Sequence, residues 1–307
     1  MGIEVEVLSP RVVPTQTRIT LSLSDRGDAR SGALRTSSGQ CIQSEDLGLV
    51  WYRRHWWPRT DWLPMLPSDQ RFAEREWYWT LSGFVACSPA VVIDGPETMP
   101  ASNKLLQLMR AQRAGLTVPR TIVSSDSDAV RTMMSECATV IHKAMSVPDD
   151  QKLLDARRMG TTECEALEHL ELAPSMFQEE VAARYEVRVT IVGDKVFAAR
   201  FDLERLRGVD VRLERDTPCE PHDLPTDVAD ALRSVARDLG ITMCCVDLRV
   251  TDAGEYVFLE LNPEGQYLFI EVMTGLPITR AVVDYLASRL GDAWPRSSSP
   301  EGVKRIE

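Results

Sequence analysis

Two carboxylates and an amide have the spacing that a magnesium site requires. The segment 243–262, MCCVDLRVTDAGEYVFLELN, alternates apolar and polar residues on both sides of a turn and so predicts a β-hairpin. If Ala253-Gly254 forms a two-residue turn, Asp247 lies directly opposite Glu260. Asn262 lies two residues beyond Glu260 and shares its face of the sheet. The neighbouring side chains are predicted to face a core: Val246, Leu248, Leu259 and Leu261.

Carboxylates that face each other across a half-buried sheet favour a bound cation. The two charges repel, and a divalent ion removes that cost. A few hard oxygen ligands suit Mg²⁺ that also holds nucleotide phosphates. The alternative is an exposed sheet face on which two acids meet by chance. The hairpin is followed directly by the run Asn262-Pro263-Glu264-Gly265, and this run favours a metal site over a chance meeting of two acids.

Two lysines stand where an ammonium group needs an anionic partner. Lys104 lies near the start of a predicted helix, and Lys143 ends the apolar strand segment 140–143 (VIHK). Nucleotide phosphates would satisfy both charges, since burying an unpaired ammonium is costly. Pairing with a local acid, or extension into solvent, is the simpler alternative for each. The sequence holds neither G-x-x-x-x-G-K-[ST] nor G-x-G-x-x-G, so neither a P-loop nor a Rossmann site is indicated.

Helices and hairpins alternate along the chain, which predicts an α+β or mixed α/β fold. Ser102 is the predicted N-cap of the helix that carries Lys104. Residues 146–165 show no clear periodicity and are predicted to form a loop. The other expected elements are strands at 18–23, 90–93, 121–124 and 139–144, helices at 72–87, 127–137, 225–239 and 278–290, and a hairpin over 187–202 that turns at Gly193-Asp194.

Composition excludes several classes of protein. The 307 residues are 44% hydrophobic and 26% charged, which is typical of a globular chain of about two domains. The formal charge of −11 argues against a general binder of nucleic acids or anionic membranes. Seven cysteines without a C-x-x-C pair fit a reducing cytoplasm and indicate no zinc site.

The order of these pieces resembles the ATP-grasp superfamily and, within it, the graspetide synthetases, the maturases of microviridin-type ribosomal peptides. The resemblance covers about residues 45–290. Its most specific part is the run from Asp247 through Glu260 to Gln266, which ends FLELNPEGQ. The supporting segments are 50–54 (VWYRR), 177–181 (FQEEV), 186–189 (EVRV) and 210–212 (DVR).

The resemblance also implies roles for individual residues. Arg188 and Lys143 are the implied catalytic residues, with Arg188 beside the γ-phosphate and the acyl phosphate. The implied ligands are Lys104 and Lys143 for ATP phosphates, Gln178, Glu179, Glu180 and Val181 for adenine and ribose, Asp247, Glu260 and Asn262 for Mg²⁺, and Glu186, Asp210 and Arg212 for the core of a precursor peptide.

The implied fold has three lobes with antiparallel sheets. Its expected parts are a first lobe over 1–97, a central lobe over 98–176, a C-terminal lobe over 177–292 and a disordered tail over 293–307. Relatives begin with a strand and a helix before the part that matches residues 2–10, so we expect a shortened first lobe.

The implied activity is ATP-dependent peptide macrocyclisation. Asp or Glu side chains of a ribosomal precursor peptide, with a leader and an acidic, Ser/Thr-rich core, would be activated as acyl phosphates. They would then be joined to Ser or Thr hydroxyls or Lys amines. We expect the protein to form a homodimer. The alternatives are a RimK-like ligase that adds an amino acid to a carboxylate, and an ATP- or peptide-binding protein without turnover.

Overall fold

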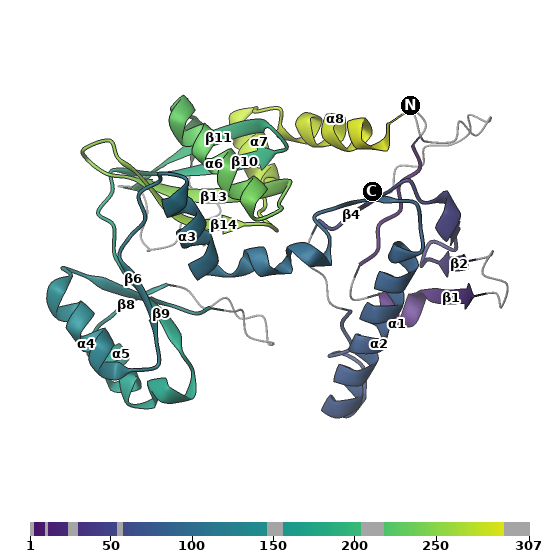
Figure 1. The fold of residues 1–307 in the computed structure, drawn as a ribbon, viewed down its shortest axis with the longest axis horizontal. Helices are drawn as coiled ribbons and strands as arrows, with labels where there is room; N and C mark the ends of the chain where they lie inside the picture. The colour runs from purple at the N-terminus through teal and green to yellow at the C-terminus, as the bar shows by residue number, and fades with distance from the viewer. Residues whose placement is uncertain are drawn as a thin grey trace. The chain divides into compact units, whose positions relative to one another are not determined.

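The protein divides into two compact units. The structure, a computed structural model, describes residues 3–9, 12–23, 30–53, 58–145, 156–203 and 218–291 (Figure 1). Contacts group residues 1–96 and 284–307 into one unit and residues 97–283 into the other. Asp210, Arg212 and the tail over 293–307 lie outside the described residues. None of the helices described is long and apolar enough to cross a membrane.

In its described residues, the first unit contains two small sheets and one long helix. Helix α2 begins at Pro67, five residues earlier than predicted. The prediction missed the first turn because this turn is polar apart from the proline and so lacks the apolar stripe. Leu81 and Phe84 of α2 pack against Val13 and Leu34. The elements are α1 (Val13–Gln16), the antiparallel strands β1 (Arg18–Leu23), β2 (Arg30–Arg35) and β3 (Cys41–Gln43), the parallel pair β4 (Leu49–Trp51) and β5 (Val91–Ile93), and α2 (Pro67–Ala86).

A four-stranded antiparallel sheet forms part of the second unit. Its order is β6-β9-β7-β8. The elements are β6 (Thr121–Ser124), α4 (Ser127–Glu136), β7 (Val140–Lys143), β8 (Arg157–Arg158), α5 (Thr161–Ala166) and β9 (Ser175–Glu179). Val130 and Met133 of α4 pack on Val140 and Phe177 of the sheet. The predicted boundary at 176/177 falls inside β9.

The predicted loop over 146–165 is wrong for its second half. Arg157–Arg158 pairs with β7, and a short helix starts at Thr161. Apolar periodicity cannot detect a strand of two residues or the first turn of a short polar helix. Residues 146–155 lie outside the described part of the chain.

The larger sheet of the second unit has five antiparallel strands in the order β12-β11-β10-β13-β14. The hairpin predicted over 187–202 is confirmed, since Val192 pairs with Lys195 across Gly193-Asp194. Gly193 has a φ of 56°, a conformation that glycine adopts without strain. The strands are β10 (Tyr185–Val192), β11 (Lys195–Asp202), β12 (Cys219–Pro221), β13 (Met243–Val250) and β14 (Tyr256–Asn262).

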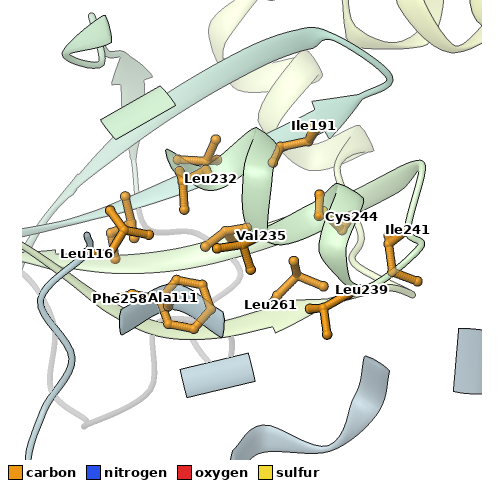
Figure 2. Packing of buried hydrophobic residues seen from close by; sticks show 14 of the residues in the cluster. Ala111, Leu116, Ile191, Leu232, Val235, Leu239, Ile241, Cys244, Phe258 and Leu261 are labelled. Atoms are coloured by element: carbon orange, nitrogen blue, oxygen red, sulfur yellow. The ribbon is translucent and has the colours of Figure 1, made fainter. Parts of the chain in front are cut away.

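Two helices bury one face of this sheet. Helix α3 (Lys104–Arg113) packs against β14 and against α6 (Thr226–Asp238). Figure 2 shows the packed side chains, to which α6 contributes Leu232 and Val235. The strands supply Val187, Val189, Ile191, Cys244, Val246, Leu248, Val250, Phe258 and Leu261. Two further helices, α7 (Leu268–Thr274) and α8 (Ile278–Leu290), follow the sheet.

The N-cap of α3 is Asn103. The prediction that Ser102 caps this helix is therefore wrong. The Asn103 side chain accepts a hydrogen bond from the backbone N–H of Leu106. Ser102 instead ends a 3₁₀ helix, Pro96–Ser102. Both residue types can cap a helix, so the sequence alone does not choose between adjacent candidates.

The predicted pairing of Asp247 with Glu260 is confirmed, although the predicted turn is wrong. Thr251 N donates to Glu255 O, so the loop has three residues, and Gly254 has a φ of 81°. The extra loop residue shifts the pairing of β13 with β14 by one residue relative to the prediction. An irregularity between Asp247 and Leu248 shifts the pairing back. Both departures together restore the register at the carboxylates.

The same irregularity changes which side chain of β14 enters the core. Leu248 pairs with Phe258, which is buried, whereas Leu259 is only partly buried. The prediction that Leu259 faces the core is therefore wrong, and Phe258 takes its place. A bulge lets two residues oppose one, which breaks the simple alternation of faces.

Candidate active site

A row of charged side chains crosses the face of the larger sheet opposite the core. Arg188 on β10 pairs with Asp247 on β13, which pairs with Glu260 on β14. Arg188 is buried, and its NH1 donates to Asp247 Oδ1 at 2.7 Å. Its NH2 donates to the backbone O of Gln266 at 3.4 Å, and the guanidinium carbon lies 5.9 Å from the ring centre of Phe269.

Lys104 extends this row beyond Glu260. Its Nζ lies 3.7 Å from Glu260 Oε2 and donates to the backbone O of Ala144 at 3.2 Å. The charges therefore run positive, negative, negative, positive from Arg188 to Lys104. The flanking cations offset part of the repulsion between the carboxylates, so the protein can hold these two acids together before any metal binds.

The oxygen atoms of this row fit Mg²⁺. Asp247 and Glu260 are direct cross-strand partners, and Asn262 follows on the same strand opposite Cys245. Within the part of the chain that the structure describes, no three His, Cys, Asp or Glu side chains form a metal cluster. Two carboxylates and an amide are too few for a closed cage but suit a cation that also binds phosphate oxygens.

Lys143 lies beside the buried amide of Gln178. Its Nζ donates to Gln178 Oε1 at 2.7 Å, and Gln178 Nε2 donates to Thr121 Oγ1 at 2.9 Å. The side chain of Gln178 therefore supports Lys143 from within the smaller sheet. Because Ala144 follows Lys143 in the chain, its bond to Lys104 brings the two predicted phosphate-binding lysines into one region.

Glu180 is held by two arginines. Arg158 Nε and NH2 each donate to one oxygen of its carboxylate at 2.7 Å. Arg249 NH1 lies 3.9 Å from Glu180 Oε1 and donates to the backbone O of Val181 at 3.0 Å. The hydrogen bonds from Arg158 lower the pKa of the Glu180 carboxyl from its usual value, against the effect of burial, and the charge of Arg249 acts in the same direction.

The backbone before Val181 is also fixed. Glu179 N–H donates to the backbone O of Arg120, and Glu180 N–H donates to that of Thr139. Glu186, for which the sequence predicts peptide binding, accepts a hydrogen bond at 2.9 Å from Arg249 Nε. Arg249 thus contacts both the predicted nucleotide segment and a predicted peptide residue.

Comparison with known proteins identifies the fold. No family model and no curated protein matches the sequence. Macrocyclase MdnC from Microcystis aeruginosa MRC, solved with precursor peptide MdnA, matches with a TM-score of 0.79 and 24% identity over 92% of this chain and 90% of its own. A RiPP-associated ATP-grasp ligase of Chryseobacterium gregarium has a TM-score of 0.81 and 22% identity, over 94% and 90%. Macrocyclase MdnB of the same Microcystis strain has a TM-score of 0.75 and 28% identity, over 91% and 89%.

The chain has the ATP-grasp fold. The predicted resemblance to ATP-grasp graspetide synthetases is confirmed at this level, as is the prediction of a mixed α/β fold with antiparallel sheets. The roles of individual residues in this ATP-grasp protein remain predictions.

Three residues that support the candidate site are absent from the sequence predictions. Arg158 and Arg249 hold Glu180, and Gln107 joins α3 to β14. Gln107 Nε2 donates to Leu261 O at 2.7 Å, and Leu261 N–H donates to Gln107 Oε1 at 3.0 Å. Gln107 thereby occupies the hydrogen-bonding edge of β14 between Glu260 and Asn262, and it fixes Lys104 one helical turn away.

The available signal for Arg249 was its place two residues after Asp247 in the same strand, which puts both charges on one face of the sheet. Gln107 is one polar residue in an amphipathic helix, and nothing in its sequence context distinguishes it.

Gly265 brings the turn after β14 onto β13. A Cβ at this position would lie 2.3 Å from Cys245 Cβ, so only glycine fits without displacement. The next residue, Gln266, supplies the carbonyl that accepts from Arg188. The glycine in the NPEGQ run therefore has a structural reason in this ATP-grasp chain.

Proposed function

We propose that this protein is an ATP-dependent peptide macrocyclase. It transfers the γ-phosphoryl group of ATP to an Asp or Glu side chain of a ribosomal precursor peptide, which gives an acyl phosphate. A Ser or Thr hydroxyl, or a Lys amine, of the same peptide then attacks the acyl carbon and releases inorganic phosphate, leaving an ester or an amide. The proposal includes a leader-bearing peptide with an acidic, Ser/Thr-rich core, a cytoplasmic location and a homodimeric enzyme.

The row from Arg188 through Asp247 and Glu260 to Lys104 carries this proposal. Phosphoryl transfer accumulates negative charge on oxygen atoms and requires positioned cations more than it requires an enzyme nucleophile. The row supplies two cations and two metal-binding carboxylates from three strands and a helix, which together form a rigid frame. A non-catalytic binder would not need this set.

The similar structures support both proposed substrates. MdnC was solved with precursor peptide MdnA, and the Chryseobacterium ligase with ADP and a leader and core peptide. The ATP-grasp ligase PsnB was solved with a minimal precursor, Mg and ADP.

Each side chain of the proposed site has a distinct task. Lys104 and Lys143 bind phosphate oxygens, and Gln178 orients Lys143. Asp247, Glu260 and Asn262 would hold Mg²⁺, which neutralises phosphate charge when bound. Arg188, buried and fixed by Asp247 and the Gln266 carbonyl, stabilises the charge of the transferring phosphoryl group and of the acyl phosphate.

The remaining assignments concern the nucleoside and the peptide. Glu180 accepts from ribose hydroxyls, and the backbone of residues 178–181 contacts adenine. Glu186, Asp210 and Arg212 engage the core peptide.

Coexpression with an acidic, Ser/Thr-rich peptide encoded beside its gene tests the proposal. Mass spectrometry should detect the loss of one water per ring, because each ester or amide forms by net dehydration. A gain in mass by one amino-acid residue would favour the RimK-like alternative. An unchanged peptide, together with ATP binding, would favour a binder without turnover.

A further inference from the structure

Arg249 occupies a position between two regions of the proposed active site. Its guanidinium is buried, with 9% of the residue exposed. Nε donates to Glu186 Oε1 at 2.9 Å, and NH1 donates to the backbone O of Val181 at 3.0 Å. The same NH1 lies 3.9 Å from Glu180 Oε1. One buried cation therefore contacts Glu180 and Val181, in the segment that joins the two sheets, and Glu186 at the start of β10.

The two acids beside Arg249 need this cation. Glu180 and Glu186 side chains are each only 14% exposed, and two like charges so close to one another and to the interior repel. Lysine would carry the same charge but could not direct separate N–H groups at a carboxylate and a carbonyl in fixed directions. The rigid fork of arginine makes this contact geometrically specific.

The second arginine on Glu180 has a different character. Arg158 comes from the two-residue strand β8, and its side chain is 63% exposed. Exposed ion pairs contribute little free energy and change geometry easily. Arg158 donates one hydrogen bond to each oxygen of the Glu180 carboxylate. Each oxygen keeps a further lone pair that can accept a hydrogen bond from a hydroxyl group. Arg249 is thus the buried cation beside Glu180: it lies within ion-pair distance of the carboxylate and fixes the Val181 carbonyl by a direct hydrogen bond.

We propose that Arg249 is a positioning residue that orients Glu180 and the Val181 carbonyl for recognition of the nucleoside part of ATP. Glu186 anchors the guanidinium from the other side. This inference rests on the proposed function, since it assumes that Glu180 accepts hydrogen bonds from the ribose. It assigns Arg249 no contact with the reacting atoms.

The test compares ATP with its 2′-deoxy and 3′-deoxy analogues by calorimetric binding. In the wild-type protein, one analogue should bind about tenfold or more weakly than ATP, because it lacks a hydrogen bond to a charged acceptor. In Arg249→Lys this ratio should fall to about two, since the carboxylate is no longer oriented. A merely structural defect would weaken ATP and its analogue alike and leave the ratio unchanged.

Arg200→Lys is the matched control. Arg200 lies on β11 of the same sheet, 3.8 Å from Glu220, and stacks 4.3 Å from the ring centre of Tyr185. This variant should keep the wild-type ratio. If Arg249→Lys also keeps it, or if wild type binds ATP without discriminating against either analogue, the inference is wrong.

A charge-balanced variant covers the case in which Arg249→Lys does not fold. The double substitution Arg249→Met with Glu186→Gln removes one buried charge of each sign and should also lose the discrimination. If it retains the wild-type ratio, the inference is overturned. Absence of any ATP binding by the wild-type protein would instead refute the proposed function itself, so the two failures are distinct.

Discussion

One face of the five-stranded sheet packs against α3 and α6, while the opposite face carries Arg188, Asp247, Glu260 and Arg249. Both faces come from the same strands, because adjacent residues point in opposite directions. The core face is apolar and depends on burial for its stability. The charged face depends on pairing, since each buried charge must find a partner.

This difference teaches which changes should separate stability from function. A truncation on the core face removes buried area and leaves a cavity, so it should lower the free energy of unfolding. A neutral substitution of either opposed carboxylate on the charged face, Asp247 or Glu260, also removes the repulsion between the two. It should therefore affect catalysis much more than folding.

The largest effect should come from the core face at Phe258. Phe258→Ala should lower the free energy of unfolding by about 3–5 kcal/mol, because this side chain is fully buried. Leu259→Ala should lower the free energy of unfolding by about 1 kcal/mol, since Leu259 is only partly buried. Urea unfolding of both variants measures the difference. Equal losses, or a greater loss at Leu259, would contradict the bulge that places Phe258 in the core.

The charged face should respond in the opposite way at Glu260. Glu260→Gln should reduce turnover by about 10²–10³-fold, equivalent to about 3–4 kcal/mol of transition-state stabilisation. Its free energy of unfolding should change by less than about 1 kcal/mol, because the loss of the contact with Lys104 is offset by relief of repulsion from Asp247. Peptide dehydration and urea unfolding, measured on the same preparation, decide this. Wild-type rates would remove Glu260 from the site.

A smaller effect should appear at Gly265, where the turn contacts the strand beneath it. Gly265→Ala should destabilise the fold by about 1–3 kcal/mol and slow turnover, because its Cβ would overlap Cys245 and displace the Gln266 carbonyl from Arg188. Gly83→Ala in α2 is the control, since a Cβ there meets its nearest neighbour at an ordinary 3.5 Å. A Gly265→Ala variant as stable and active as Gly83→Ala would contradict the close contact.

The smallest effect should be the contribution of Arg158 to stability. Arg158 lowers the pKa of Glu180 in the folded state below the usual value of 4.5. Its stabilisation is therefore complete above about pH 4.5 and is lost as the pH falls through the lowered pKa. Arg158→Met should cost up to about 1 kcal/mol at pH 7, because the arginine is largely exposed. Unfolding at several pH values should show this difference disappear in acid, and a difference independent of pH would exclude the ion pair as its cause.

The sequence was sufficient for the parts of the fold that depend on near neighbours. Alternation along 187–202 and 243–262 predicts two hairpins and assigns most of their side chains to the correct face. It also predicts that Asp247 meets Glu260. It did not predict the three-residue loop or the bulge, because both insert one residue without changing composition. The two errors cancel at the carboxylates and remain visible only at Phe258 and Leu259.

Contacts between distant segments required the tertiary structure. Lys104 meets Glu260 because Gln107 fixes α3 on the edge of β14, and Arg249 meets Val181 and Glu180 because β13 lies beside β10. Periodicity tells which face a side chain occupies, but not which other element will cover that face. The sequence by itself therefore determined which residues could do chemistry, and only the packing of helix on strand decided which of them stand together.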